Sequence, residues 1–340
     1  MKEIIKKDNL LLKILLIVSP IIIAVIALCI GRYMLTPGEV RDVLVNQFIN
    51  SNVSVPETNI SVVLNVRMPR IILAIMVGMG LSISGAAFQG LFSNPLATPD
   101  TLGVAAGASF GAALGLLMTE NMFAVQIIAL IFGLVAVMCT YLISKIQGKS
   151  TILMVVLSGM VTSSFFQALI SLIKYVADPE TKLPTITYWL MGSMASVSYK
   201  TLITGVPFII IGVIIIYLLR WRLNILALSE DEAKTMGIKV SQLRWVVIIA
   251  STLITASAVS MCGQVGWIGL LIPHISRMLV GTNHKRVIPV SISLGASYMI
   301  IIDTFARSIA ATEIPLSILT AIVGAPFFAY LLRKTGGGWL

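Results

Sequence analysis

Long apolar segments dominate this sequence and leave little chain between them. A helix that crosses a bilayer needs about 20 apolar residues, so ten such helices use roughly 200 of the 340 residues. The remainder forms short connections without room for a separate soluble domain. The sequence therefore predicts one all-α, polytopic membrane domain over residues 1–340. The predicted spans lie near 10–34, 71–92, 101–118, 122–144, 151–175, 201–220, 243–263, 266–281, 287–303 and 314–332.

The composition excludes several classes of protein. Hydrophobic residues make up 57% of the chain, charged residues 11%, and the mean hydropathy is +0.99, whereas soluble domains carry about 25% charged residues. A secreted enzyme and a disordered chain are excluded. The net charge of +10 comes from basic residues scattered between apolar segments, so we expect no nucleic-acid partner. Cys29, Cys139 and Cys262 lie inside apolar segments and lack disulfide or metal-site spacing. We expect no metal or cofactor.

The distribution of basic residues predicts the orientation of the chain. With the N-terminus inside, 16 of the 24 Lys and Arg residues fall in inner segments, in agreement with the positive-inside rule. Ten spans then put both termini in the cytosol. The longest outer segment is a polar loop over 35–66, and the longest inner segment is 221–242. A further apolar piece at about 185–195 is too short to span and is predicted to form a re-entrant helix in the outer half.

Two glycine-containing patterns carry different information. Gly103, Gly107, Gly111 and Gly115 are spaced four apart, which places them on one helix face and predicts backbone-close packing against a neighbouring helix. GKST at 148–151 ends like a phosphate-binding loop, but Ile143 stands where the full pattern requires glycine. Nucleotide binding is not expected here. Energy for any transport must then come from a gradient or from a separate ATPase.

Few ionisable residues lie at membrane depth. Asp303 and Glu313 fall near span ends, close to Arg307, which argues against an ion-coupled carrier without excluding it. Arg67 and Arg70 lie outside at the mouth of the second span, where they bind either lipid headgroups or an acidic partner. Inside, residues 224–240 form either a solvated connection or a short amphipathic helix presented to a cytosolic partner.

Several long blocks resemble the FecCD family of permeases from ATP-binding-cassette (ABC) importers for iron-siderophores, haem and vitamin B12. The blocks are RMPRIILAIMVGMGLSISGAAFQGLFSNPLATPDTLGVAAGASFG at 67–111, ADPETKLPTITYWLMGSM at 177–194, ALSEDEAKTMGI at 227–238 and GWIGLLIPHISRMLVGTNHKRVIPVSISLGASYMIIIDTFARSIAATEIPLSILTAIVGAPFFAYLLRK at 266–334. They cover the chain from the second span onward and occur in the family's order.

The resemblance implies a permease that works as a homodimer with two copies of a cytosolic ABC ATPase and a substrate-binding protein. A coupling helix within 221–242 would contact the ATPase through Leu228, Glu232, Ala233, Met236 and Gly237. Arg67, Arg70 and Arg307 match positions at which the family docks the binding protein. The fifth span and the 185–195 helix would line the path, with Ser150 and Thr151 as a hypothetical inner gate. No catalytic residues are expected, so the chain is not predicted to be an enzyme.

The same resemblance favours a ferric siderophore as the substrate, carried across the plasma membrane of a bacterium or archaeon. Haem and cobalamin are alternative cargoes within the family. An ion-coupled secondary transporter is the alternative from another class.

Overall fold

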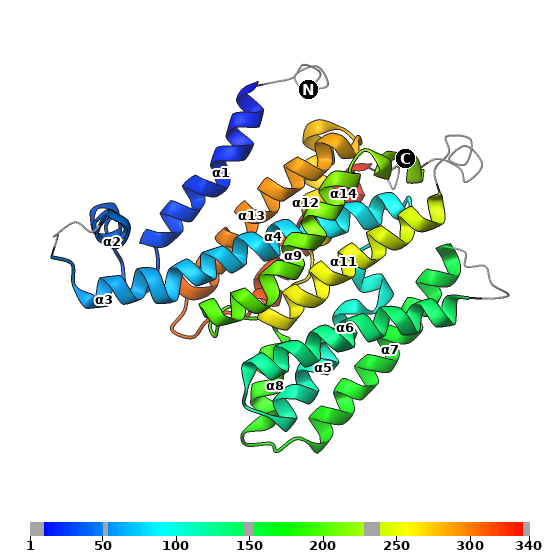
Figure 1. The fold of residues 1–340 in the computed structure, drawn as a ribbon, viewed down its shortest axis with the longest axis horizontal. Coiled ribbons are helices and arrows are strands. Elements are labelled where there is room, and N and C mark those ends of the chain that lie inside the picture. The colour runs from blue at the N-terminus through cyan, green and yellow to red at the C-terminus, as the bar shows by residue number, and fades with distance from the viewer. Residues whose placement is uncertain (1–9, 50–53, 146–151, 228–238, 336–340) are drawn as a thin grey trace.

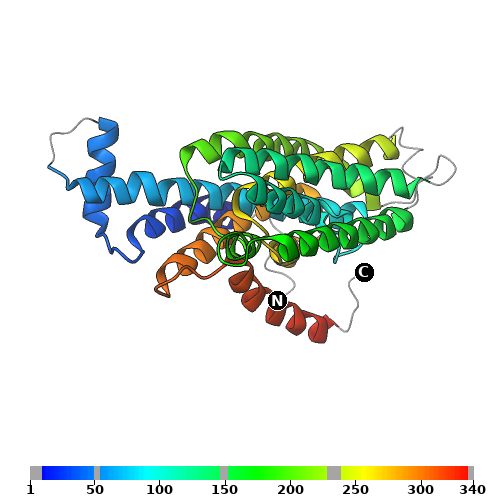
Figure 2. The same ribbon diagram turned by 90° about the horizontal axis from the view of Figure 1, so that it is seen from below.

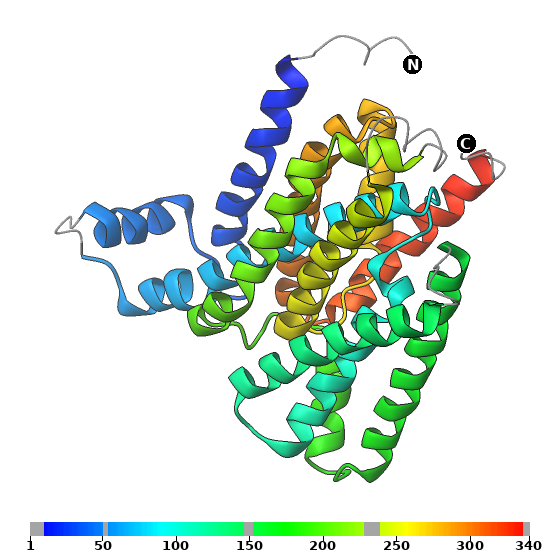
Figure 3. The same cartoon turned by 45° about the vertical axis from the view of Figure 1, so that its right-hand side comes forward.

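The computed structural model describes residues 10–49, 54–145, 152–227 and 239–335, and within these ranges every regular element is helical. The helices form an elongated bundle (Figure 1). Figures 1 and 3 show α5 to α8 on one side of α11, whereas α1, α12 and α13 lie on the other side, around α4.

Six helical segments are long and apolar enough to cross a membrane, and four further apolar helices accompany them in the described part of the chain. Each predicted span overlaps one of these ten. The long segments are α3–η1–α4 (Glu57–Leu91), α6 (Met122–Ser144), α7 (Ile152–Val176), α9 (Tyr199–Leu219), α11 (Val240–Cys262) and α13 (His284–Ser308). The other four helices are α1 (Leu10–Cys29), α5 (Val104–Met118), α12 (Ile268–Val280) and α14 (Leu316–Thr335), of which α5 and α12 are the short ones. Figure 2 shows α14 at the edge of the bundle.

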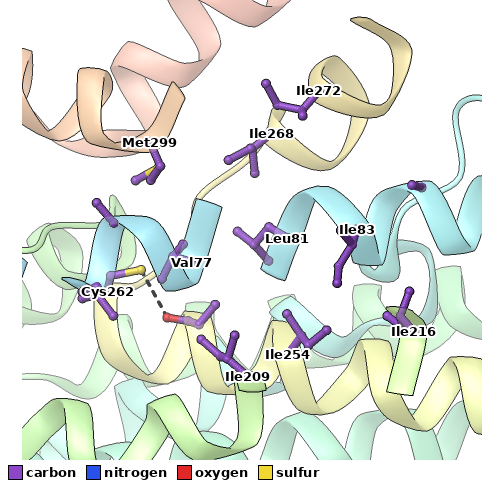
Figure 4. Packing of buried hydrophobic residues seen from close by; sticks show 14 of the residues in the cluster. Val77, Leu81, Ile83, Ile209, Ile216, Ile254, Cys262, Ile268, Ile272 and Met299 are labelled. Carbon is purple, nitrogen blue, oxygen red and sulfur yellow. Dashed lines mark hydrogen bonds between the residues drawn. The ribbon is translucent and has the colours of Figure 1, made fainter. Parts of the chain in front are cut away.

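Helix α4, Met68–Leu91, lies at the centre and is buried along most of its length. It packs against α9, α11, α12 and α13, as the close view in Figure 4 shows for Val77, Leu81 and Ile83. Leu73 and Ile83 are fully buried between these neighbours. An element that is apolar all round fits such a central position, because no face of it has to meet water or headgroups.

The prediction of a polar loop over residues 35–66 is wrong, because much of this segment is helical. Helix α2 spans Pro37–Ile49, and α3 (Glu57–Ile60) with the π-helical turn η1 (Ser61–Arg67) extends α4 (Figure 1). Thr36 and Glu39 form a capping box at the start of α2: the amide and hydroxyl of Thr36 donate to the Glu39 carboxylate over 2.7 and 2.8 Å. These bonds hold the pKa of Glu39 below its usual value.

The two short helices begin inside the bundle. Helix α5 has 15 residues and α12 has 13, so they rise about 22 and 20 Å, less than the roughly 30 Å of the hydrocarbon core. Irregular chain precedes both: residues 92–103, including the 3-10 turn η2 (Pro99–Leu102), precede α5, and residues 263–267 precede α12. Such backbone at membrane depth is tolerated where protein buries it or a cavity accepts it.

Gly107, Gly111 and Gly115 of α5 pack against α6, which confirms the prediction from their spacing for three of the four glycines. Gly103 is the N-cap of α5, with a φ of +79°, and lies against Ser163 of α7 instead. A Cβ atom on Gly107 would lie 2.6 Å from the Phe132 carbonyl oxygen, and one on Gly111 would lie 2.6 Å from the Ile128 carbonyl oxygen. The two backbones are therefore in contact, as small residues allow in lipid.

We predict that Gly111→Ala destabilises the bundle by about 2 kcal/mol, because the added methyl group overpacks a backbone contact that cannot yield. Gly266→Ala is the matched control, since a Cβ there meets no atom within 4 Å and its φ is not positive. Unfolding of both variants in detergent, followed by helical circular dichroism, measures the difference. Equal unfolding midpoints for the two variants would contradict the packing assignment.

Candidate functional site

The two irregular segments face the same cavity. It has a volume of about 520 Å³ and is open on one side. Residues 98–100 of the η2 segment and residues 264–270 around the start of α12 form much of its wall. Ser163 and Gln167 on α7 and Ser317 and Ala321 on α14 complete the lining, together with residues of α4, α5 and α11. Irregular backbone at membrane depth and a cavity therefore coincide, which defines the candidate transport pathway.

The lining combines apolar side chains with hydroxyl and amide groups. Thr98, Ser163, Gln167 and Gln264 are among its polar members, and Asp100 is the one ionisable residue among those that line the cavity. The described part of the chain holds no group of three or more His, Cys, Asp or Glu side chains placed to bind a metal ion. This lining can contact a solute through weak hydrogen bonds and apolar surface.

A group of backbone contacts around α8 and the turn that follows it lies at one end of the bundle. The predicted piece near 185–195 forms α8 (Lys182–Leu190), which is too short to span. The turn after α8 is fixed on both sides: the Ser193 amide donates to the Cys262 carbonyl over 2.9 Å, and the Leu316 amide donates to the Gly192 carbonyl over 2.9 Å. The α8 turn therefore ties the end of α11 to the start of α14. α7 contributes Ser163 and Gln167 to the cavity lining, as predicted for the fifth span, whereas α8, which was predicted to line the path as well, contributes no residue to it.

The structure brings together the three arginines predicted for docking, inside the bundle. Arg67, Arg70 and Arg307 are 3%, 3% and 7% exposed. The guanidinium of Arg67 donates to the carbonyl oxygens of Leu28 and Tyr33, and that of Arg307 donates to the Ala27 carbonyl. The last carbonyls of a helix lack intrahelical partners and attract cations. Arg67 and Arg307 thus cap the C-terminal end of α1.

Arg70 forms a buried ion cluster with Asp303 on α13 and Glu313 in the connection to α14. Its Nη2 atom lies 2.7 Å from Asp303 Oδ1 and 3.1 Å from Glu313 Oε2, and its Nη1 atom lies 2.6 Å from Glu313 Oε1. Arg307 adds a 3.6 Å contact to Asp303. We call Arg70, Asp303, Arg307 and Glu313 the outer ion cluster. Sequence reasoning noted the carboxylates near Arg307 and missed their pairing with Arg70.

Docking by the three arginines stays a prediction, since the structure contains no partner chain and gives each guanidinium an internal contact. The predicted coupling residues Leu228, Glu232, Ala233, Met236 and Gly237, and the hypothetical gate residues Ser150 and Thr151, lie outside the described residues.

The comparisons with known proteins agree with this architecture. The model of the FecCD transport family matches residues 16–334. The molybdate import permease MolB of Haemophilus influenzae is 41% identical over 319 residues, which cover 94% of each chain. A Helicobacter pylori permease described as part of an iron chelatin transport system is 36% identical over 320 residues, covering 93% of this chain and 96% of the relative. A solved inward-facing ABC transporter described as of the metal-chelate type has a TM-score of 0.85 and 40% identity, covering 95% of this chain and 99% of that one.

A multi-pass membrane helix bundle with a cavity between broken helices is a transport permease architecture. The chain belongs to the FecCD transport family, as the match over nearly its whole length shows. It is a permease of an ABC importer, and the family match does not favour the alternative of an ion-coupled secondary transporter. An ATPase and a substrate-binding protein are its implied partners.

We predict that Arg70→Gln lowers the free energy of unfolding by about 3 kcal/mol, because it leaves Asp303 buried without its main partner. Arg41→Gln is the control: Arg41 pairs with Asp42 over 2.8 Å, but its side chain is 73% exposed, so the expected change is about 0.5 kcal/mol or less. Chemical unfolding in detergent compares the two. In the double variant, Arg70→Gln with Asp303→Asn, the free energy of unfolding should fall by less than the sum of the decreases in the two single variants. Additive losses would refute the coupling between the two side chains.

Proposed function

We propose that this chain carries an iron complex, in particular a ferric siderophore, into the cytoplasm as the permease subunit of an ABC importer. It would cross the plasma membrane ten times, with both termini in the cytosol. The observation that carries the proposal is the cavity between broken helices in a chain of the FecCD family. The four further apolar helices support the count of ten, since with the six long segments they supply one apolar helix for each proposed crossing.

Asp100 favours a chelate over a free oxyanion as cargo. The relatives include a molybdate permease and an iron chelatin permease, so family membership alone does not choose between them. The cavity wall contains a carboxylate and no cationic side chain. A dianion would meet like charge at this carboxylate, and the wall offers it no compensating cation. A chelate supplies its own metal ligands and needs only weak contacts with the wall.

We propose that a second copy of the chain closes the open side of the cavity. The face of α7 carries large exposed apolar side chains, among them Leu157, Met160 and Phe165, and α14 exposes Ile318 and Ile322. Both helices border the cavity. A homodimer formed through them would join two half-cavities into one path, with two ATPase copies below.

The outer ion cluster supports a role in docking the binding protein. Together with Arg67 it contains three guanidinium groups and two carboxylates, which leaves a net positive charge beneath the end of the bundle. That charge attracts an acidic surface even though the arginines themselves are buried, and Glu313, with a side chain 22% exposed, is the member nearest the surface. Arg67, Arg70 and Arg307 would then act by shaping and charging the docking face.

Reconstitution with the co-purified ATPase and binding protein tests the substrate. We expect ATP-dependent uptake of an iron-siderophore complex, with molybdate uptake at least about tenfold slower, since a tenfold ratio needs only 1.4 kcal/mol of discrimination. Iron and molybdenum in the vesicles are counted by mass spectrometry. Faster uptake of molybdate would replace the iron assignment and leave the permease role standing. Transport without ATP would contradict the proposal that the chain works in an ABC importer.

If residues 228–238 couple the chain to the ATPase, altering them should separate ATP hydrolysis from substrate transport. Deletion of 229–236, or Gly237→Pro, should leave ATP hydrolysis intact while substrate transport stops, because the ATPase then has no segment on which to act. Gly237→Ala is the control at the same position, since alanine neither breaks a helix nor removes an amide proton. ATP consumed and substrate delivered are measured on the same vesicles. Normal transport by the deletion variant would exclude this segment as the contact.

A further inference from the structure

The short 3-10 turn η3 (Arg222–Ala227) leads from α9 into the predicted coupling segment and is firmly attached to the bundle. Leu223, Ile225 and Leu226 are buried, and η3 lies against α4. Asn224, between them, is turned away from this apolar contact and is only partly buried. Its amide group is therefore available for contacts of its own, and these determine what η3 is attached to.

Asn224 uses both ends of its amide on the first residues of α13. Its oxygen accepts from the backbone N–H of His284 over 2.9 Å and lies 3.2 Å from His284 Nδ1. Its Nδ2 atom donates to Asn283 Oδ1 over 3.2 Å. Asn283 in turn caps α13, accepting from the Lys285 amide over 2.9 Å. We call Asn224, Asn283 and His284 the Asn224 clamp.

The other edge of the His284 ring meets α4. A Cβ atom on Gly90 would lie 2.7 Å from His284 Nε2, so the ring lies directly against the α4 backbone. The adjacent Gln89 donates to the Gly269 carbonyl over 3.1 Å and accepts from the guanidinium of Arg277, both on α12. The ends of α4, α12 and α13 are thereby joined, and the Asn224 clamp connects η3 to all three.

We propose that Asn224 and His284 are positioning residues that transmit movement of the coupling segment to α4 and α13. The inference rests on the proposed contact of 228–238 with the ATPase. The physical reason is the directness of the link: η3 is followed immediately by the coupling segment, and the side chain of Asn224 bonds to the first turn of α13. With the clamp in place, a displacement of η3 moves the ends of α13 and α4. Without the clamp, η3 moves against an apolar surface that has no directional contacts.

Asparagine is suited to this position because it donates and accepts at once. Asn224→Ala removes these three contacts, and with them the hydrogen bond from Nδ2 to the Trp221 carbonyl oxygen over 3.2 Å. It leaves the buried leucine and isoleucine side chains of η3 in place. His284→Phe keeps a ring against Gly90 and removes the ring nitrogens, with the contact from Nδ1 to Asn224 and the hydrogen bond to the Ala86 backbone. The two variants therefore weaken the same link to different degrees, while the packing of the turn is retained.

The test uses the whole transporter in vesicles, with ATP consumed and substrate delivered measured together. Asn224→Ala should assemble with the ATPase and keep its basal hydrolysis, while substrate delivered per ATP falls about tenfold, the loss expected when hydrogen bonds worth about 1.4 kcal/mol no longer hold the moving element. His284→Phe should show a smaller loss in the same direction. Asn121→Ala is the matched control: Asn121 also caps a helix, accepting from the Phe123 amide over 3.0 Å, but does so at the start of α6, away from the clamp.

The outcomes separate this proposal from the proposed function. Normal delivery per ATP in Asn224→Ala, with the 229–236 deletion uncoupled, would overturn the clamp alone. Normal delivery in the deletion variant would overturn the coupling role on which the clamp depends. If Asn224→Ala does not assemble with the ATPase, His284→Phe provides the test. Substrate delivered per ATP by His284→Phe equal to that of Asn121→Ala would then overturn the proposal. Lower ATP hydrolysis with unchanged delivery per ATP would also overturn it, because that pattern indicates a structural role.

Discussion

Close backbone contact around α4 is the interaction on which the rest of this structure depends. Helices in lipid gain nothing from hydrophobic burial against one another, so they associate through tight packing and hydrogen bonds. A Cβ atom on Gly78 would lie 2.2 Å from the Gly295 carbonyl oxygen of α13, and one on Gly85 would lie 2.0 Å from the Gly269 carbonyl oxygen of α12. Helices α12 and α13 therefore touch the backbone of α4 directly, and a side chain on either glycine would force them apart.

This packing explains where charge and polar groups are placed. Helices α4 and α13 are held together along their length by apolar and backbone contacts, and the polar links lie at their ends. At one end Arg70 joins Asp303 and Glu313, and at the other His284 lies between Asn224 and Gly90. Glu313 precedes α14 and Asn224 precedes the predicted coupling segment. A rigid pair of helices therefore connects the two places where partners are proposed to act.

The sequence predicted the apolar helices well because a bilayer imposes one length and one composition on each of them. Residues 122–144 coincide with α6 to the residue. Helix α2 was missed because hydropathy marks spans and ignores caps, although Thr36, Pro37 and Glu39 carry the signal of a helix start. The burial of Arg70 could not be predicted in the same way. Its partners lie 233 and 243 positions away, and their contact depends on how α4 and α13 are paired.

The cavity could not be predicted from any single segment, because segments far apart in the sequence form its walls. Its walls come from η2, the segment before α12, α7, α11 and α14, so no single stretch of sequence marks it. What the sequence does contain is the shortness of α5 and α12, since 15 and 13 residues cannot cross a bilayer alone. A helix that is too short must be completed by irregular chain, and irregular chain at membrane depth requires either protein cover or a cavity. Two short helices whose preceding segments line one cavity therefore mark the candidate pathway, and α4, which is paired with α13, contributes Leu81 to its wall.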